Sequence, residues 1–308
     1  MIVKKNLSCW LALVLLFLTS SLWAQPQNSL LWKISGHGLK HPSYVYGTVH
    51  SGEAQAFTFK KLILPYMKEC SMFAAEIKLD EVNPFAMLGK LQMPGDTTLK
   101  MLLSEKEYAK LEQVMRDSFG IEMAMFNTIK PIFLAGIMEG GGGGLADLGG
   151  DEEGTAFLDM YLMEQAEKWK KECIGIETVE EQLSAVDMIP LQEQAKMLTE
   201  GLFDTAMSTG EQLDDLLTIY ATGNLDSLYA YYKKGDLSNT FNKAVVLDRN
   251  HRMAHRIDSI MQLKTIFVAV GALHLPGEEG VLTLLKQQGY TVEPVYDKKT
   301  KPGKATKI

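Results

Sequence analysis

The sequence predicts an α/β protein: a mixed sheet built from both ends of the chain, with a large, mostly helical insertion in the middle. The chain has 308 residues, of which 46% are hydrophobic, so it is long enough to bury a substantial core. Short β-rich runs gather near the two ends, whereas residues from about 97 to 256 have the periodicity of long helices. Two of the β-rich runs end in the same motif, Gly-x-x-His.

Residues 1–24 have the composition of a secretory signal peptide. They contain two lysines, an apolar run from Trp10 to Phe17 and a small residue, Ala24, at the cleavage position. The run is shorter than the roughly 20 residues that a membrane span needs, and no later run is long and apolar enough for one. We therefore expect an exported protein, periplasmic or extracellular, with no transmembrane span in the mature chain.

The charge balance argues against nucleic acid as a partner. The chain carries 31 basic and 38 acidic residues, and removing Lys4 and Lys5 with the signal peptide leaves 29 basic residues and a net charge of about −9. Residues 298–308 are rich in lysine and have no apolar periodicity, which predicts a flexible basic tail. Residues 25–297 are expected to form a single domain that includes the helical insertion.

The first part of that domain predicts a hairpin, then a helix and a third strand. Two β-rich runs are joined by a turn that contains glycine, proline, His37 and His41, and both histidines are expected to be turn residues. A stretch with helical periodicity follows, and then an apolar run typical of a buried strand. In order, these segments are "LLWKISG", "SYVYGTV", "FTFKKLILPYMKEC" and "SMFAAEIKL".

The middle of the chain is predicted to be helical apart from one strand, "CIGIETVEEQ". Ser104 followed by Glu107 is a capping-box signature at the start of one helix. The segment "MEGGGGGLADLGGDEEG" lacks both the Gly-Lys-Ser/Thr ending of a P-loop and the strand–glycine–helix order of a dinucleotide site. It is therefore expected to be a linker or lid. Near the end of the chain, "KTIFVAVGALH", "GEEGVLTLLKQQG" and "YTVEPVY" predict strand, helix and strand.

Cys70 and Cys173 are the two cysteines outside the signal peptide, so the chain is no disulfide scaffold. Each stands just before or within a strand-like run that carries a glutamate. If those strands are neighbours, an exported protein could bridge them, but buried thiols are the commoner outcome. The sequence leaves the two states open.

The paired Gly-x-x-His motifs are the main candidates for chemistry. In "YVYGTVH" and "VAVGALH" a β-rich run ends at Gly47 or Gly271, and His50 or His274 follows three residues later. Ligands of open α/β sheets bind at the carboxyl ends of the strands, and glycine permits a sharp turn or a close approach there. Two imidazoles and a carboxylate make a site for a divalent transition metal or for acid–base catalysis.

Several glutamates are candidates for the carboxylate of this site. Glu76 lies inside an apolar strand, where an unpaired charge is costly, so it needs a cation, a metal or a proton. Glu177 lies in a strand of its own and is either an orienter of a histidine or a paired structural acid. Glu53, Glu278 and Glu279 follow the histidines and are expected at helix starts, where the helix dipole stabilises negative charge.

His251 and His255 are four residues apart on a predicted helix, a spacing that two ligands of one metal ion can have. "HRMAH" lacks the glutamate of the His-Glu-x-x-His motif, however. Both histidines are therefore expected on a surface face of the helix.

Together these segments resemble the TraB/GumN family, which is related to the Tiki metalloproteases and, more distantly, to erythromycin-esterase-like proteins. The resemblance runs from about Leu31 to Val295 and is most specific in the last segment. The segments that carry it are "LWKISG", "SYVYGTVH", "FAAEI", "CIGIETVEEQL", "DRNHRMAHRI" and "FVAVGALHLPGEEGVLTLLKQQGYTVEPV". Asp248 stands where the family motif often has glutamate, a change that keeps the charge.

The resemblance implies a secreted or membrane-associated protein with a hydrolase-like fold and a metal-dependent active site. Its residues are the two Gly-x-x-His motifs and the strand glutamate, supported by polar groups of "DRN"; by number they are Gly47, His50, Glu76, Gly271, His274, Arg249 and Asn250. A divalent ion (manganese, cobalt or zinc) held by His50, Glu76 and His274 would lower the pKa of a bound water and polarise a scissile carbonyl.

Two functions stay open at this stage. The first is an exported metal-dependent hydrolase that cleaves a peptide bond in a peptide or protein substrate. The second is a non-catalytic regulatory protein that binds a peptide or factor in the same cleft. If one histidine is the general base, the same residues are needed without the metal. An esterase function rests on the remote resemblance alone, because the chain has no Gly-x-Ser-x-Gly elbow for a serine nucleophile.

Overall fold

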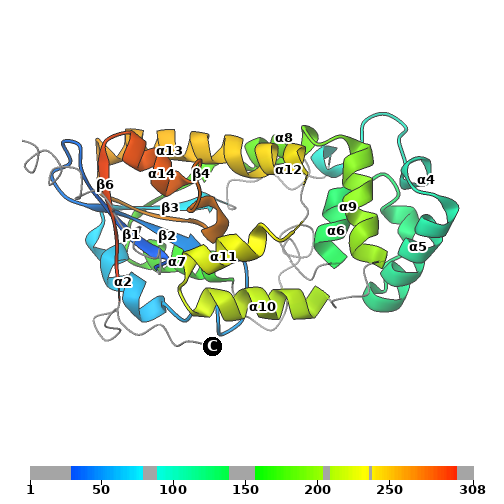
Figure 1. The fold of residues 1–308 in the computed structure, drawn as a ribbon, viewed down its shortest axis with the longest axis horizontal. Helices are drawn as coiled ribbons and strands as arrows, with labels where there is room; N and C mark the ends of the chain where they lie inside the picture. The colour runs from blue at the N-terminus through cyan, green and yellow to red at the C-terminus, as the bar shows by residue number, and fades with distance from the viewer. Residues whose placement is uncertain (1–28, 79–88, 139–156, 204–208, 236–237, 297–308) are drawn as a thin grey trace, which may run out of the picture.

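A six-stranded mixed sheet forms the centre of the molecule, with strand order β4-β3-β5-β2-β1-β6 (Figure 1). The structure is a computed structural model that describes residues 29–78, 89–138, 157–203, 209–235 and 238–296. The strands are β1 (Leu31–Gly36), β2 (Ser43–Thr48), β3 (Met72–Ile77), β4 (Glu172–Glu177), β5 (Ile266–Gly271) and β6 (Tyr290–Pro294). The predicted α/β fold with a sheet drawn from both chain ends is confirmed. The expected signal peptide, the glycine-rich segment and the basic tail lie outside the described residues.

Four neighbouring strands of the sheet run in the same direction. β2 pairs with β5, β5 with β3, and β3 with β4, all in parallel, while β1 is antiparallel to both β2 and β6. In the β2–β5 register Thr48 lies opposite Gly271, so the two Gly-x-x-His motifs leave the sheet side by side. Because the carboxyl ends of parallel strands meet at one edge, His50, Glu76, Glu177 and His274 all belong to that edge.

Helices make up most of the described chain between β3 and β5. The predicted capping box of Ser104 and Glu107 is present at the start of α5, and Thr178 and Glu181 form a second one at α8. The helices are α2 (Lys60–Glu69), α4 (Leu99–Leu102), α5 (Glu105–Phe119), η2 (Met123–Met125), α6 (Pro131–Met138), α7 (Leu158–Lys168), α8 (Val179–Asp187), α9 (Leu191–Phe203), α10 (Thr209–Ala221), α11 (Leu225–Tyr232), α12 (Asn239–Phe241), η3 (Asn242–Leu247), α13 (Asp248–Met261), η4 (Ala272–His274) and α14 (Val281–Gln287). Of the η elements, η3 is a π-helix and the other two are 3₁₀-helices.

Helices cover both faces of the sheet and form a separate lobe beside it. Figure 1 shows α13 and α14 on one face, and α2, α7 and α10 on the other. One hydrophobic cluster joins the sheet to these helices, and a second lies among α4, α5, α6, α8 and α9. The second cluster begins at the carboxyl edge of the sheet, since Ile77 at the end of β3 packs against it. The polar residues of that edge therefore lie where the two cores adjoin.

The expected positions of three glutamates are wrong. α14 begins at Val281 and has no acidic residue in its first turn, so Glu278 and Glu279 precede the helix. The cause is a tight turn before the helix, in which the Gly280 N–H donates to the Gly277 carbonyl at 3.2 Å. A Cβ at Gly280 would lie 2.1 Å from the Pro276 oxygen, so only glycine fits this turn. Glu53 is likewise followed by several turn residues before α2 begins at Lys60.

Cys70 and Cys173 are both thiols rather than a disulfide. The β3–β4 register places Cys173 opposite Phe73, whereas Cys70 lies two residues before β3 begins, so the two side chains do not face each other. Burial raises the pKa of the Cys70 thiol to about 12, which makes it inert at neutral pH. Of the two states that the sequence leaves open, the structure has the thiols.

Across the described residues, no helix combines the length and apolar character that crossing a membrane requires.

Two buried tyrosines fasten α10 to the first histidine motif. The Tyr220 hydroxyl donates to the Gly47 carbonyl at 2.9 Å, so at the 2.7 Å contact between the two hydroxyls Tyr46 is the donor. Both side chains are fully buried, and burial raises the pKa of each hydroxyl well above its usual value. Tyr220 therefore makes two buried hydrogen bonds, and Tyr46 makes one.

We predict that Tyr220→Phe lowers the free energy of unfolding more than Tyr46→Phe does. Removing the Tyr220 hydroxyl leaves the Tyr46 hydroxyl buried without its acceptor, at a cost of about 1–3 kcal/mol. Removing the Tyr46 hydroxyl leaves the Tyr220 bond to Gly47 intact. Urea denaturation of the two variants and the wild type measures the difference. Equal losses in the two variants would show that the bond to Gly47 contributes nothing.

Candidate active site

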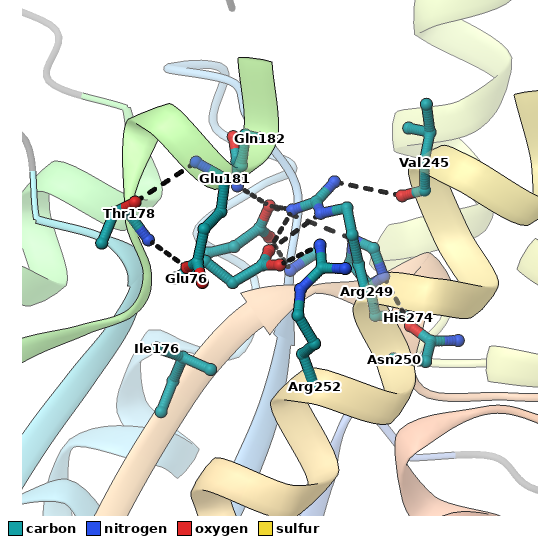
Figure 2. A network of polar contacts seen from close by, with 12 residues as sticks. Glu76, Ile176, Thr178, Glu181, Gln182, Val245, Arg249, Asn250, Arg252 and His274 are labelled. Carbon is teal, nitrogen blue, oxygen red and sulfur yellow. Dashed lines mark hydrogen bonds and ion pairs between the residues drawn. The ribbon is translucent and has the colours of Figure 1, made fainter. Parts of the chain in front are cut away.

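The Glu76 carboxylate accepts three hydrogen bonds near the end of β3 (Figure 2). Its Oε1 accepts hydrogen bonds from Gln182 Nε2 at 2.8 Å and from the Arg249 guanidinium, and its Oε2 accepts from the Gly271 N–H at 2.9 Å. Burial alone would raise the pKa of Glu76, but the charge that His274 carries in acid, the charges of Arg249 and His50, and the Gly271 N–H hold that pKa well below its usual range. Glu76 is therefore ionised, and Arg249 supplies the cation that its buried position requires.

Arg249 lies between two carboxylates. Its Nε donates to Glu177 Oε2 at 2.8 Å, its Nη2 contacts both glutamates, and its Nη1 donates to the Val245 carbonyl at 3.2 Å. The Glu177 side chain has no exposed surface and also receives Arg252 Nη2 at 3.2 Å. Glu177 thus pairs with arginines, as the structural-acid alternative expects. With its donors committed in this way, Arg249 holds Glu76 in place.

His274 projects from η4, directly after β5, and is 8% exposed. Its Nδ1 lies 2.7 Å from Asn250 Oδ1, and the Asn250 Nδ2 donates to the Glu279 carbonyl at 2.8 Å. Because an amide oxygen only accepts, Nδ1 carries the ring proton and Nε2 carries the lone pair. Nε2 lies 4.0 Å from Glu76 Oε1. Burial lowers the pKa of His274 to about 4, which leaves the ring neutral near pH 7.

His50 lies two residues beyond β2, and its environment differs from that of His274. Its Nδ1 is 3.0 Å from Asp159 Oδ2, and 56% of its side chain is exposed. Asp159 comes from α7, and its Oδ1 accepts from the Thr48 hydroxyl at 2.6 Å. The charge of His50 acts on the pKa of both Glu76 and His274, so the three side chains share one electrostatic environment.

Close contacts with neighbouring atoms explain why both motif positions, 47 and 271, are glycine. A Cβ at Gly47 would lie 2.9 Å from Ala272 Cα, so a side chain there would push β2 away from the turn that carries His274. A Cβ at Gly271 would lie 3.3 Å from Glu76 Oε2 and 3.4 Å from His274 Cδ2. Glycine at position 271 therefore keeps open the space between the carboxylate and the imidazole.

Three residues at this edge were not predicted from the sequence: Asp159, Gln182 and Arg252. Gln182 follows the capping-box residue Glu181 directly, so the helix start in "IETVEEQ" fixes where it points once β4 is placed beside β3. Asp159 has no comparable signal, because only the packing of α7 brings it to His50. Of the other predicted histidines, His255 is exposed and His251 is half-exposed and pairs with Glu279 at 2.9 Å. Both histidines therefore lie on the exposed surface of α13, as expected.

The donor chemistry at this edge suits a divalent transition ion. His274 is neutral with its lone pair on Nε2, His50 has Nδ1 beside a carboxylate, and Glu76 Oε2 keeps one acceptor position. Metal-ligating histidines usually have an acceptor on the other ring nitrogen, as both do here. Among the residues described, no three His, Cys, Asp or Glu side chains stand close enough together to hold an ion. The predicted ligand set of His50, Glu76 and His274 thus stays a prediction.

The fold and site define an α/β protein with a charged polar cluster at the carboxyl edge of a largely parallel sheet. The chain belongs to the TraB/PrgY/gumN family, whose model matches residues 30–294. The predicted family is confirmed.

Several curated relatives are metalloproteases. Metalloprotease TIKI1 of Danio rerio is 24% identical over 317 residues, covering 86% of this chain and 63% of the relative. Metalloprotease TIKI1 of Homo sapiens is 23% identical over 335 residues, covering 89% and 64%. The chain thus spans less than two thirds of the length of these relatives. No solved structure matches the chain.

We predict that Arg249→Met destabilises the protein more than Glu76→Gln does. Without Arg249, Glu76 loses its arginine partner and Glu177 keeps only Arg252, and breaking a buried ion pair costs about 3–5 kcal/mol. In Glu76→Gln the arginine keeps Glu177 as its partner. Urea denaturation of both variants tests the order. If Arg249→Met proves the more stable variant, the network does not depend on the arginine charge.

Proposed function

We propose that this protein is an exported metal-dependent hydrolase that cleaves peptide bonds. The observation that carries the proposal is the neutral His274, whose Nε2 lone pair lies 4.0 Å from the ionised Glu76 at a strand edge that His50 also joins. The relatives named metalloproteases support the same chemistry. Export is proposed on the signal-peptide composition of residues 1–24.

The divalent metal ion would be held by three groups: Nε2 of His50, Nε2 of His274 and the Glu76 carboxylate. A divalent ion bound there supplies a water of lowered pKa and a Lewis acid for the scissile carbonyl. Asn250 keeps the His274 proton on Nδ1, and Arg249 keeps Glu76 ionised. Gln182 and the Gly271 N–H fix the orientation of the same carboxylate. These contacts orient the carboxylate and the imidazole before substrate binds, which lowers the entropy lost on binding.

The two histidines are suited to different tasks. The half-exposed His50 can exchange a proton with solvent, and the Asp159 carboxylate beside it stabilises the ring when it is charged. The buried His274 faces an amide oxygen and stays neutral. If no ion is bound, His50 is instead the histidine suited to accept a proton as water attacks the carbonyl carbon and to return it to the leaving amine.

We predict that the purified protein cleaves members of a peptide library in the presence of manganese, cobalt or zinc, and that a chelator abolishes cleavage. His274→Ala should lower the rate at least ~100-fold, the contribution typical of a group that acts directly in proton transfer or metal binding. His255→Ala is the matched control, because that exposed histidine lies on α13 away from Glu76. Products are detected by mass spectrometry, and metal uptake by equilibrium dialysis.

The same assay separates the hydrolase from a peptide-binding regulator. Stoichiometric capture of peptides without new termini, unchanged by chelation, would overturn the proposed hydrolase in favour of the regulator. Metal-dependent cleavage that survives both His274→Ala and His50→Ala would place the chemistry elsewhere in the chain.

A further inference from the structure

Asp159 is anchored firmly beneath the first histidine motif. It lies in the first turn of α7, a helix whose Leu158, Leu162 and Ala166 are buried in the sheet core. The Leu158 N–H donates to the Ser51 carbonyl at 3.2 Å, which ties the start of α7 to the loop that carries His50. The Asp159 side chain is 17% exposed. Its position relative to His50 is thus set by core packing.

The Asp159 carboxylate has one oxygen for Thr48 and one for His50. Oδ1 accepts from the Thr48 hydroxyl at 2.6 Å, and Oδ2 lies 3.0 Å from His50 Nδ1. Oδ2 is buried and has no hydrogen-bond partner among the described residues. A buried carboxylate oxygen is costly without a donor. His50 Nδ1 lies 3.0 Å from this atom, so a small rotation of the ring would supply the donor.

A simple helix-dipole role does not account for this arrangement. An acidic residue in the first turn of a helix is favourable because of the dipole, but an exposed carboxylate provides that benefit equally well. The Asp159 side chain is instead turned onto the end of β2, where Thr48 fixes one oxygen and leaves the other toward His50. This orientation favours an interaction of the Asp159 carboxylate with the His50 imidazole.

We propose that Asp159 is the positioning residue of His50: it holds the ring with the proton on Nδ1, so that Nε2 carries the lone pair used at the site. The inference rests on the proposed function for the use of that lone pair, but the tautomer itself is independent of any activity. His274 is held in the same way by Asn250.

Ring ¹⁵N NMR of the metal-free protein tests the tautomer directly. The chain has six histidines, and the His50 signals are assigned as those lost in His50→Ala. In the wild type we expect protonation at Nδ1 for His50, and in Asp159→Asn a shift toward the Nε2–H tautomer, with His274 unchanged. Glu164→Gln, an exposed acid on the same helix, is the matched control and should leave His50 as in the wild type. An unchanged His50 tautomer in Asp159→Asn overturns the proposal.

A second variant covers the case in which Asp159→Asn does not fold. Thr48→Val removes the hydroxyl that fixes Oδ1 and leaves the carboxylate charge in place. It should broaden or shift the His50 ring signals in the same direction, by a smaller amount. Identical His50 signals in Thr48→Val and the wild type would count against positioning through Asp159.

On a peptide that the wild type cleaves, Asp159→Asn should lower kcat roughly 10- to 100-fold with little change in KM, as expected for the partner of a reacting histidine. A merely structural role would lower the melting temperature and leave kcat of the folded fraction unchanged, which overturns the proposal. If the wild type cleaves no peptide, the proposed function fails, and the ¹⁵N signals still decide the role of Asp159.

Discussion

A guanidinium buried between two carboxylates is the interaction on which the rest of the site depends. Arg249 lies in the first turn of α13, Glu76 is next to last in β3 and Glu177 ends β4, so one ion network ties a helix to two neighbouring strands. Each of these charges is almost fully buried and would be costly alone. The chain therefore reaches a low free energy only when these three elements are in register, which is also the register that sets Glu76 beside His274.

The largely parallel sheet explains why residues from distant parts of the chain meet. β2 and β5 come from opposite ends of the sequence, and their parallel pairing sets the two glycine–histidine motifs next to each other. β3 pairs with the other side of β5, which adds Glu76 to the same edge. The motif glycines then allow the strand and the turn to approach within van der Waals distance. The repeated motif is a geometric device, because both copies leave the sheet at neighbouring strand ends.

Much of this edge could be predicted because the residues lie within patterns that report on local structure. A glutamate in an apolar strand demands a partner, and histidines just beyond β-rich runs indicate a strand edge. Asp159 could not be predicted, since it lies 111 residues from Thr48 and reaches it only through the packing of α7. The predicted helical position of Glu278 and Glu279 is wrong for a local reason. A tight turn around Gly280 delays the start of α14 to Val281, and composition does not reveal where such a turn closes.

The two histidines lie beside acceptor groups of different charge. Each has an acceptor at Nδ1, an amide for His274 and a carboxylate for His50. His274 is neutral, and the neighbouring Glu76 is kept ionised by Arg249. In the proposed hydrolase these groups would hold the ion that activates water for attack on the amide carbonyl.

The most direct test of this account is a crystal structure of the protein grown with manganese or cobalt, with the ion located by its anomalous scattering. The account predicts an anomalous peak at about 2.0–2.2 Å from Nε2 of both His50 and His274, with Glu76 as the oxygen ligand. A fully occupied ion bound elsewhere, with no peak between the two histidines, would contradict it.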